Sequence, residues 1–350
     1  MKIFRKTLIL IIILVLFSIT FIGSTRNSIC TSAQTVPGKT IRVVVLISSF
    51  DDAYISLVRQ SLENIQKENS GKVEFFFFDG KGNQDIQNET MTSIFETNFD
   101  LMLANLVDIN TNTVDSLINK VKQKNVPVIL FNIAPVVTDS IKSYPKALVI
   151  ATDAAQSGML QGKIIVNEWT NNKALIDKNK DNTLQYVMIT SKSNNTLTSA
   201  RTKYSVSTIR DAGIKTQEIA QVTSGDNKES TKVDFEQIFL RFSTKIESVI
   251  ANDDTMAIGA IEALQKYGYN TGDPSKTIPV VGANAIPEAR ALIKRGIMTG
   301  TVVQDAPAMA EALYKIGMNL VYNKNPLDNT NYKFNETGVV IEMPYYEYKK

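Results

Sequence analysis

Short apolar runs alternate with segments of helical spacing along most of the chain. Residues 41–47 form a β-branched run, which is typical of a strand buried on both faces of a parallel sheet. Residues 54–68 then place Ile55, Val58 and Leu62 three or four positions apart, which predicts an amphipathic helix. The same patterns predict strands at 73–78, 101–104 and 126–131 and helices at 86–95 and 114–121.

The alternation restarts in the second half of the chain. The expected strands are 147–151, 184–189, 219–222, 246–251, 278–281 and 302–303. The expected helices are 154–169, 200–212, 233–242, 255–264, 286–295 and 309–321. Strict alternation indicates parallel sheets covered by helices on both faces. Because so many strands exceed one comfortable twisted sheet, we expect an α/β fold of two similar lobes.

Polar side chains gather directly after the predicted strands, where parallel sheets bind ligands. They are Asp51, Asp52, Asn105, Asp108, Asn132, Asp153, 191–195, Asn252, Asp253, Asp254, Asn284, Gln304 and Asp305. Any one of them can be explained as a helix N-cap. Taken together, the amides and carboxylates favour a polar cleft suited to a ligand with many hydroxyl groups.

Composition excludes several classes of protein. The chain has 350 residues, 43% hydrophobic and 21% charged, and its formal net charge of +3 is spread along the sequence. We therefore expect no nucleic-acid partner. There is no histidine, and the single cysteine is Cys30 in the N-terminal segment. Most familiar acid–base, zinc and thiol chemistries are thereby excluded, so we expect a protein that is not an enzyme.

Residues 1–33 resemble a targeting segment. A basic start precedes an apolar run over residues 8–22, as in secretory signal peptides. This run is slightly shorter than the ~20 residues of a comfortable transmembrane helix. We expect export to the periplasm or the outer face of the membrane, with a retained N-terminal anchor as the alternative. Lipidation at Cys30 is a further alternative, although Ile29 stands where a small residue is usual.

Residues 177–185 read Asp-Lys-Asn-Lys-Asp-Asn-Thr-Leu-Gln. Oxygen-bearing groups fall at the positions that begin an EF-hand calcium loop, including the carbonyl of Thr183. Asn182 replaces the usual glycine, and Met188 replaces the usual final glutamate. The sequence thus predicts a calcium site completed by a distant carboxylate, with a solvated turn as the alternative.

Seven stretches carry a family resemblance: 50–52, 105–108, 125–128, 200–202, 249–254, 286–289 and 300–305. In order and spacing they resemble the galactose- and glucose-binding members of the type I periplasmic-binding-protein family, over almost the whole chain after residue 41. The resemblance implies two lobes that close on a ligand in the interlobe cleft. The N-terminal lobe would contain residues 40–133 plus 305–324, and the C-terminal lobe residues 134–304 plus 325–350.

The resemblance also implies site residues. For a structural calcium ion they are Asp177, Asn179, Asp181, Thr183, Gln185 and Glu247. For a sugar they are Asp52, Tyr54, Asn105, Asn195, Arg201, Asp253, Asn284 and Gln304. Asp52, Asn105 and Arg201 keep the family's residue identity, while the others are exchanged.

Three departures leave the sugar open. Asn195 stands in place of a histidine, Leu197 in place of an aspartate, and Asp226 near the place of a stacking tryptophan. Losing a buried hydrogen-bond partner costs about 1–3 kcal/mol. A pentose or a differently substituted hexose therefore fits as well as galactose or glucose.

The resemblance implies a monomeric solute receptor of a sugar ABC importer. Its partners would be a monosaccharide and the membrane permease of the transporter. The alternative is a membrane-tethered sugar sensor that presents the closed state to a receptor histidine kinase. A glycosidase is disfavoured because the adjacent Asp51 and Asp52 do not form an opposed carboxylate pair.

Overall fold

The computed structural model describes residues 39–135, 138–191, 196–225 and 227–350. The chain divides into two compact units, Met1–Thr40 and Ile41–Lys350, and every element named below belongs to the second. The predicted leader with Cys30 lies outside the described residues, as do Asn195 and Asp226. Within the described ranges, each helix is too short or too polar to cross a membrane.

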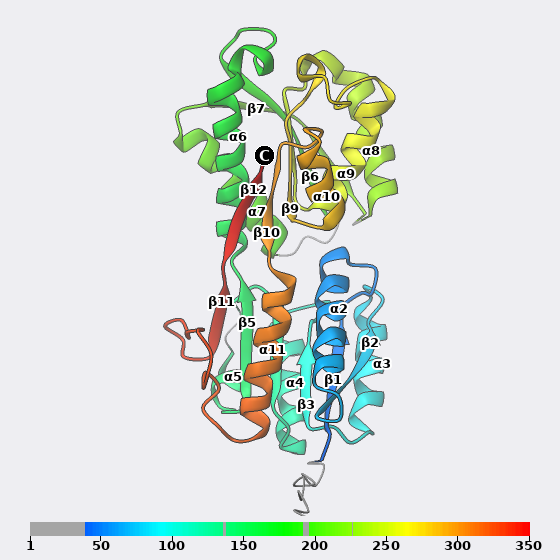
Figure 1. The fold of residues 1–350 in the computed structure, drawn as a ribbon, viewed down its shortest axis with the longest axis vertical. Helices are drawn as coiled ribbons and strands as arrows, with labels where there is room; N and C mark the ends of the chain where they lie inside the picture. The colour runs from blue at the N-terminus through cyan, green and yellow to red at the C-terminus, as the bar shows by residue number, and fades with distance from the viewer. Residues whose placement is uncertain (1–38, 136–137, 192–195, 226) are drawn as a thin grey trace, which may run out of the picture. The chain divides into compact units, whose positions relative to one another are not determined.

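The first sheet has six parallel strands in the order β11-β5-β4-β3-β1-β2 (Figure 1). Its strands are β1 (Ile41–Ile47), β2 (Val73–Asp79), β3 (Leu101–Ala104), β4 (Val128–Ile133), β5 (Ala147–Thr152) and β11 (Val340–Met343). Helices α2 (Ala53–Glu68) and α11 (Ala306–Val321) cover one face. Helices α3 (Gln84–Phe95), α4 (Thr111–Lys124) and α5 (Asp139–Lys142) cover the other face.

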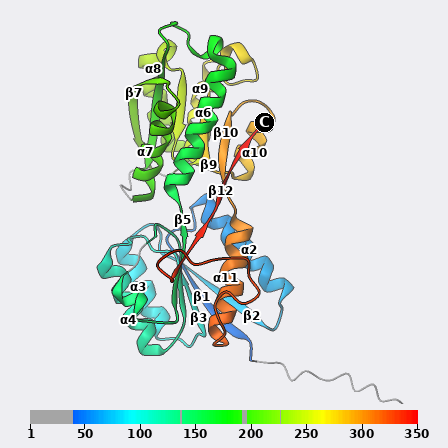
Figure 2. The same ribbon diagram turned by 90° about the vertical axis from the view of Figure 1, so that its left-hand side faces the viewer.

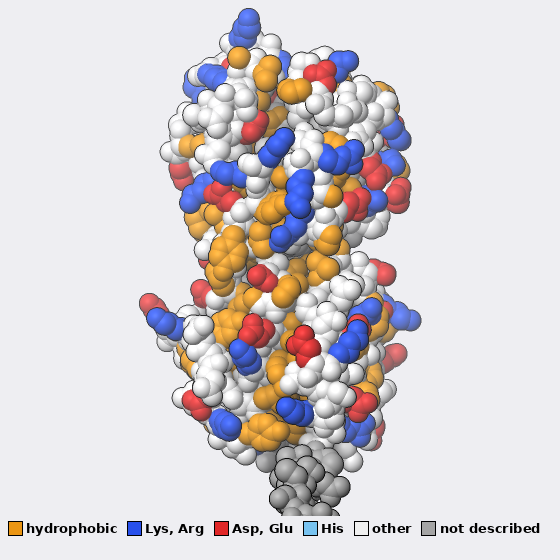
Figure 3. Space-filling model, viewed as in Figure 1, with side chains coloured by type: hydrophobic (Ala, Val, Ile, Leu, Met, Phe, Trp, Pro, Cys, Tyr) orange, Lys and Arg blue, Asp and Glu red, His pale blue; other side chains and the backbone are white. Residues whose placement is uncertain are grey.

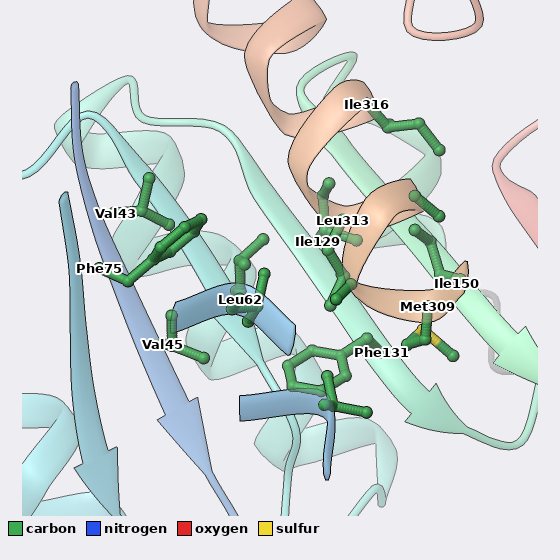
Figure 4. Close-up of a cluster of buried hydrophobic side chains, with 14 of the residues drawn as sticks. Val43, Val45, Leu62, Phe75, Ile129, Phe131, Ile150, Met309, Leu313 and Ile316 are labelled. Carbon is green, nitrogen blue, oxygen red and sulfur yellow. The ribbon is translucent and has the colours of Figure 1, made fainter. Parts of the chain in front are cut away.

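Apolar side chains on both faces explain why this sheet forms. In β1, Val43 and Val45 point to the α2 and α11 face, whereas Val44 and Leu46 point to the opposite one. Figure 4 shows the first of these clusters, in which Phe131 and its neighbours meet the two helices. A strand buried on both faces needs a continuous apolar run, as the sequence predicted.

The second sheet has the order β12-β10-β9-β8-β6-β7, and only β12 runs antiparallel to its neighbour. Its strands are β6 (Thr183–Ser191), β7 (Lys215–Ser224), β8 (Ser248–Ala251), β9 (Val280–Asn284), β10 (Gly300–Gln304) and β12 (Tyr345–Lys349). Helices α8 (Lys228–Phe242), α9 (Asp254–Lys266) and α10 (Pro287–Lys294) cover one face. Helices α6 (Ala154–Ile176) and α7 (Thr196–Asp211) cover the other, as the two views in Figures 1 and 2 show.

Within the described residues, the chain passes between the sheets at three points: Asp153, Asp305 and Pro344. Asp153 and Asp305 are N-caps, which accept hydrogen bonds from the backbone of α6 and α11 respectively. Pro344 separates β11 from β12 and has no N–H to continue either ladder. The two-lobed α/β fold expected from the sequence is confirmed.

Sheet membership differs from the expected lobe boundaries at two places. Strand β5 pairs with β4, and β11 pairs with β5, so both belong to the first sheet. The expected ranges 134–304 and 325–350 had assigned these two segments to the C-terminal lobe. The alternation that returns at residue 147 first continues the first sheet, and β11 then adds to the same sheet beside β5.

Strands β4 and β9 begin later than predicted, for a shared reason. Strand β4 begins at Val128 because Val126 still donates to the Val121 carbonyl at the end of α4, and Pro127 has no N–H. Strand β9 begins at Val280, after Pro279. The sequence did not predict the single-turn helix α5, the C-terminal strands β11 and β12, or two short 3-10 helices at Ser243–Lys245 and Pro274–Lys276.

Candidate functional site

A cavity of about 460 Å³ opens at the carboxyl ends of strands from both sheets. Polar residues at these ends include Ser48 after β1, Asn105 after β3 and Asn132 in β4. From the second sheet come Asn252 after β8 and Gln304 at the end of β10. Most of the polar residues predicted to cluster after the strands line this cavity. The cavity lining does not include Asp108, Asp153, Asp254 or Asp305.

Seven of the eight sugar-site residues implied by the sequence line this cavity. They are Asp52, Tyr54, Asn105, Arg201, Asp253, Asn284 and Gln304. The eighth, Asn195, is outside the described residues. Leu197 also lines the cavity, with Met256 and Ile133 among the other apolar residues of its wall.

Two of the carboxylates are also helix caps. Asp52 accepts from the Ile55 backbone N–H at 2.8 Å at the start of α2. Asp253 accepts from the Met256 backbone N–H at 2.8 Å at the start of α9. Each cap fixes one carboxylate oxygen at the cavity wall. The two residues are therefore both helix N-caps and part of the polar cavity, which the sequence had offered as alternatives.

Asn105 forms hydrogen bonds within the first sheet. Its Oδ1 accepts from the Ser48 hydroxyl at 2.6 Å, and its Nδ2 donates to the Phe131 carbonyl at 3.2 Å. The side chain is nearly inaccessible to solvent. These contacts join the ends of β1, β3 and β4 at the edge of the cavity.

Gln304 connects the two sheets inside the cavity. Its Nε2 donates to Asn132 Oδ1 at 2.6 Å. Asn132 adopts φ +51°, a left-handed conformation that asparagine tolerates better than most residues. A ligand that binds both amides has to compete with this hydrogen bond or bind beside it.

Arg201 on α7 has one nitrogen without a protein partner. Its guanidinium donates to the Asn252 carbonyl at 2.8 Å and to the Tyr345 hydroxyl at 3.3 Å. The third nitrogen, Nε, is buried and has no partner. Close packing of α7 on α6 places this residue, because a Cβ on Gly158 would lie only 2.5 Å from the Arg201 carbonyl oxygen.

Three further buried polar atoms in the cavity wall also lack partners: the Tyr54 hydroxyl, Asn252 Oδ1 and Asn284 Oδ1. Asn284 is held at φ +99°, an uncommon backbone conformation for a residue with a side chain. Such atoms are rare in native interiors, and each calls for an explanation. Together with Arg201 Nε, they form a mixed set of unused donors and acceptors on residues of the cavity wall.

Burial raises the pKa of the Tyr54 phenol well above its ordinary value, and the nearby Tyr345 and Asp52 act in the same direction. The Gln304 amide is close enough to oppose this shift in part, but it forms no hydrogen bond of normal geometry with the hydroxyl. The phenol therefore stays protonated at neutral pH and can donate or accept one hydrogen bond.

Asn132 and Asn252 line the cavity and were named from the sequence among the polar residues that follow predicted strands, but the family resemblance did not place them among the sugar-site residues. Tyr345 was missed because the strand that carries it was not predicted. Its hydroxyl is the acceptor that orients one end of the Arg201 guanidinium.

The calcium-like loop lies between α6 and β6, and Glu247 reaches it from just before β8. Glu247 accepts from the backbone N–H groups of Lys178 at 2.9 Å and Gln185 at 3.0 Å. Burial raises the pKa of Glu247, and the charges of Asp177 and Asp181 raise it further. The structure therefore brings the distant glutamate to the loop, as the resemblance implied.

The donor set of this loop fits a cation in part. Asp177 Oδ1 is buried without a partner. By contrast, Asn179 and Gln185 direct their side-chain nitrogens at Asp181 Oδ2, at 2.9 and 2.7 Å. Among the described residues, no group of three or more acidic, cysteine or histidine side chains stands ready to hold a metal ion. A cation here would need the amide oxygens of Asn179 and Gln185 as ligands. Both amide groups would have to rotate so that the oxygen takes the place of the nitrogen.

Comparison with known proteins agrees with this geometry. A family model described as "Periplasmic binding protein domain" matches residues 43–325. The D-galactose/methyl-galactoside binding periplasmic protein MglB of Haemophilus influenzae is 31% identical over 306 residues, which cover 87% of this chain and 88% of that protein.

Two solved structures share the fold. An ABC transporter periplasmic solute binding protein from Actinobacillus succinogenes with bound D-allose has a TM-score of 0.71 at 14% identity, covering 89% of this chain and 98% of that one. An ABC transporter solute binding protein from Bacillus halodurans with bound myo-inositol has a TM-score of 0.68 at 21% identity, covering 89% and 95%. The family model spans most of the chain, and the relative covers it to a similar extent. The chain therefore belongs to the periplasmic-binding-protein family.

Proposed function

We propose that this protein is the solute receptor of an ABC importer for a monosaccharide or a closely related polyol. The observation that carries the proposal is a set of four buried, unpartnered polar atoms on residues that line one cavity: Tyr54 Oη, Arg201 Nε, Asn252 Oδ1 and Asn284 Oδ1. Each unsatisfied buried group costs about 1–3 kcal/mol. A ligand whose hydroxyls both donate and accept would satisfy this mixed set.

The similar proteins support this class of ligand. The Haemophilus relative is described as binding D-galactose and methyl-galactoside, and the two solved structures hold D-allose and myo-inositol. All four compounds are small and carry several hydroxyls. The apolar wall at Leu197 leaves the choice among such compounds open and favours one with an apolar substituent or a missing hydroxyl on that side.

Transport needs no catalytic step by this protein. Binding energy would favour a closed arrangement of the lobes, which a membrane permease then recognises. We propose that the chain acts as an exported monomer and is not an enzyme. The sensor alternative draws no support from the relatives, two of which are transporter proteins by description.

The surface in Figure 3 fits a ligand of low charge. On that face, basic and acidic side chains are interspersed, with apolar side chains between them. A mixed surface of this kind generates no strong single-sign field that would steer a polyanion to it.

A thermal-shift screen of the mature protein against monosaccharides, methyl glycosides and inositols tests the proposed function. A ligand that binds only the folded state raises the melting temperature. At a concentration about one hundred times Kd, it adds about 2.7 kcal/mol to the free energy of unfolding. At least one compound should produce a saturable shift that isothermal titration confirms. No shift with any of them would refute the proposed ligand class.

We also propose a structural calcium ion in the loop at residues 177–185. The oxygen ligands would come from Asp177, Asn179, Asp181, Thr183, Gln185 and Glu247. Two observations support this: the unpartnered Asp177 Oδ1, and the carboxylates that raise the pKa of Glu247. A divalent cation would supply the positive charge that this group of oxygens attracts.

Chelation tests the calcium proposal. Removing calcium from the purified protein should lower its melting temperature, and adding calcium back should restore it. Glu247→Gln should remove most of this response, whereas Glu218→Gln, elsewhere in the same sheet, should keep it. Unchanged melting on chelation, with no calcium detected by elemental analysis, would refute the site.

A further inference from the structure

The carboxyl ends of β8 and β9 carry much of the cavity wall but are joined by little backbone pairing. The two strands pair only at Val249–Val280 and Ile250–Val281. The residues that reach the cavity, Asn252 and Asn284, come after these pairs. The Asn252 N–H donates to the Ile189 carbonyl at 3.0 Å, and Asn284 pairs with Val303, so each residue is held by its other neighbouring strand. No backbone pairing between β8 and β9 reaches the two residues themselves.

Gln161 on α6 joins the two strand ends from one face of the sheet. Its side chain is fully buried, and Nε2 donates to the Ala251 carbonyl at 2.7 Å and to the Gly282 carbonyl at 3.0 Å. Ala251 directly precedes Asn252, and Gly282 lies two residues before Asn284. A single amide group thus bridges the gap where strand pairing ends.

Asp254, at the start of α9, acts from the opposite face. It is fully buried, and its Oδ2 accepts from the Ile286 N–H at 2.9 Å. Its Oδ1 accepts from the Thr301 hydroxyl at 2.5 Å, and that hydroxyl accepts from the Ala285 N–H at 3.3 Å. The carboxyl therefore holds the backbone on the far side of Asn284.

The segment held in this way is strained. Asn284 and Ala285 have φ of +99° and +54°, in succession. Residues with side chains adopt such conformations only where the surroundings fix them. Gly282 makes room for the contact, because a Cβ there would lie 2.3 Å from Asp254 Oδ1.

We propose that Gln161 and Asp254 are positioning residues for ligand binding: from opposite faces of the second sheet, they hold Asn252 and Asn284 at the separation that the ligand requires. Neither side chain lines the cavity. The inference rests on the proposed function, since it assigns these two residues to the ligand site described above. A merely structural role would lower stability without a specific effect on that site.

Asn270 provides a matched control for general stability. It is also fully buried in the second lobe, where its Nδ2 donates to the Ile278 and Ile297 carbonyls at 2.8 and 2.9 Å. Ile278 precedes β9 and Ile297 precedes β10, so both contacts lie at the strand ends away from the cavity. Asn270→Ala removes a buried polar side chain of comparable connectivity without touching the cavity segments.

Two measurements test the proposal on Gln161→Leu, Asp254→Ala and Asn270→Ala. Isothermal titration with the best-binding sugar should show Kd raised about tenfold or more in the first two variants, which corresponds to the loss of about one well-placed hydrogen bond at the ligand. Hydrogen–deuterium exchange without ligand should be faster at Ala285 and Ile286 in Asp254→Ala. Asn270→Ala should lower the melting temperature but keep Kd and the exchange of these two amides unchanged.

Wild-type Kd and wild-type exchange in folded Gln161→Leu and Asp254→Ala would overturn the proposal, as would an equal loss of affinity in Asn270→Ala. If Asp254→Ala does not fold, the same two measurements are made on Asp254→Asn. Its remaining side-chain oxygen should preserve part of the ligand affinity and part of the protection of the Ala285 and Ile286 amides from exchange. If the wild-type protein binds no sugar, the proposed function fails. The exchange measurement still decides whether Asp254 holds the segment.

Discussion

Arg201→Met should weaken ligand binding much more than it weakens the fold. The substitution removes the guanidinium with its unpartnered Nε and its hydrogen bonds to the Asn252 carbonyl and Tyr345 hydroxyl. A hydrogen bond from a charged donor contributes about 1.5–3 kcal/mol. One such bond to the ligand therefore corresponds to a Kd raised about 10- to 100-fold.

The free protein should change less. Methionine leaves the Asn252 carbonyl without its 2.8 Å donor, but it also removes a charged group that is only partly paired. We expect a loss of stability of at most about 2 kcal/mol. Circular dichroism and thermal melting would show that the fold is retained.

Arg210→Met is the matched control, because it lies on the same helix but is exposed and donates to Thr216 outside the cavity. Titration calorimetry on both variants, with the best-binding sugar, decides between the two positions. Arg210→Met should keep the wild-type Kd. A folded Arg201→Met that also binds within about twofold of wild type would show that the guanidinium does not contact the ligand.

Other residues around the cavity predict three further outcomes. Gly158→Ala should displace α7, because the added Cβ would lie 2.5 Å from the Arg201 carbonyl oxygen. The variant should be less stable by about 1–3 kcal/mol and should bind ligand more weakly. An unchanged melting temperature would contradict the close packing of the two helices. Leu197→Asp should improve binding of galactose or glucose relative to methyl glycosides by titration, and unchanged preferences would place Leu197 away from the ligand. Burial raises the pKa of Asp254 to about 8, with nearby Asp253 acting in the same direction, so its stabilising contribution is present below its ordinary pKa and is lost as the pH rises through about 8. Asp254→Asn should flatten the fall in melting temperature between about pH 4 and about pH 8, and parallel profiles would refute this.

The sequence predicted the architecture well because parallel strands buried on both faces leave long apolar runs. The sequence prediction was wrong about where some strands begin and about which sheet the late strands join, because backbone hydrogen bonding determines both. Strands β4 and β9 start late because of Pro127 and Pro279, and β11 is too short and too far along the chain to reveal which sheet it joins.

The candidate site was partly predictable for a similar reason. Residues such as Asn284 follow a strand, and topology sends all strand ends to one side. Gln161 gave no such signal, because its partners are 90 and 121 residues away along the chain. Long-range contacts of this kind leave no periodic trace in a sequence.

The late position of β11 in the chain has a consequence for biosynthesis. A ribosome adds about 5–20 residues each second and delivers the N-terminal end first. Strand β11 completes the edge of the first sheet, and β12 completes the edge of the second. Until the residues after Gly338 emerge, the β5 edge exposes backbone groups that can pair with another chain. The first sheet therefore reaches its full width only after all of its other strands have been made, and its β5 edge is unprotected for most of synthesis.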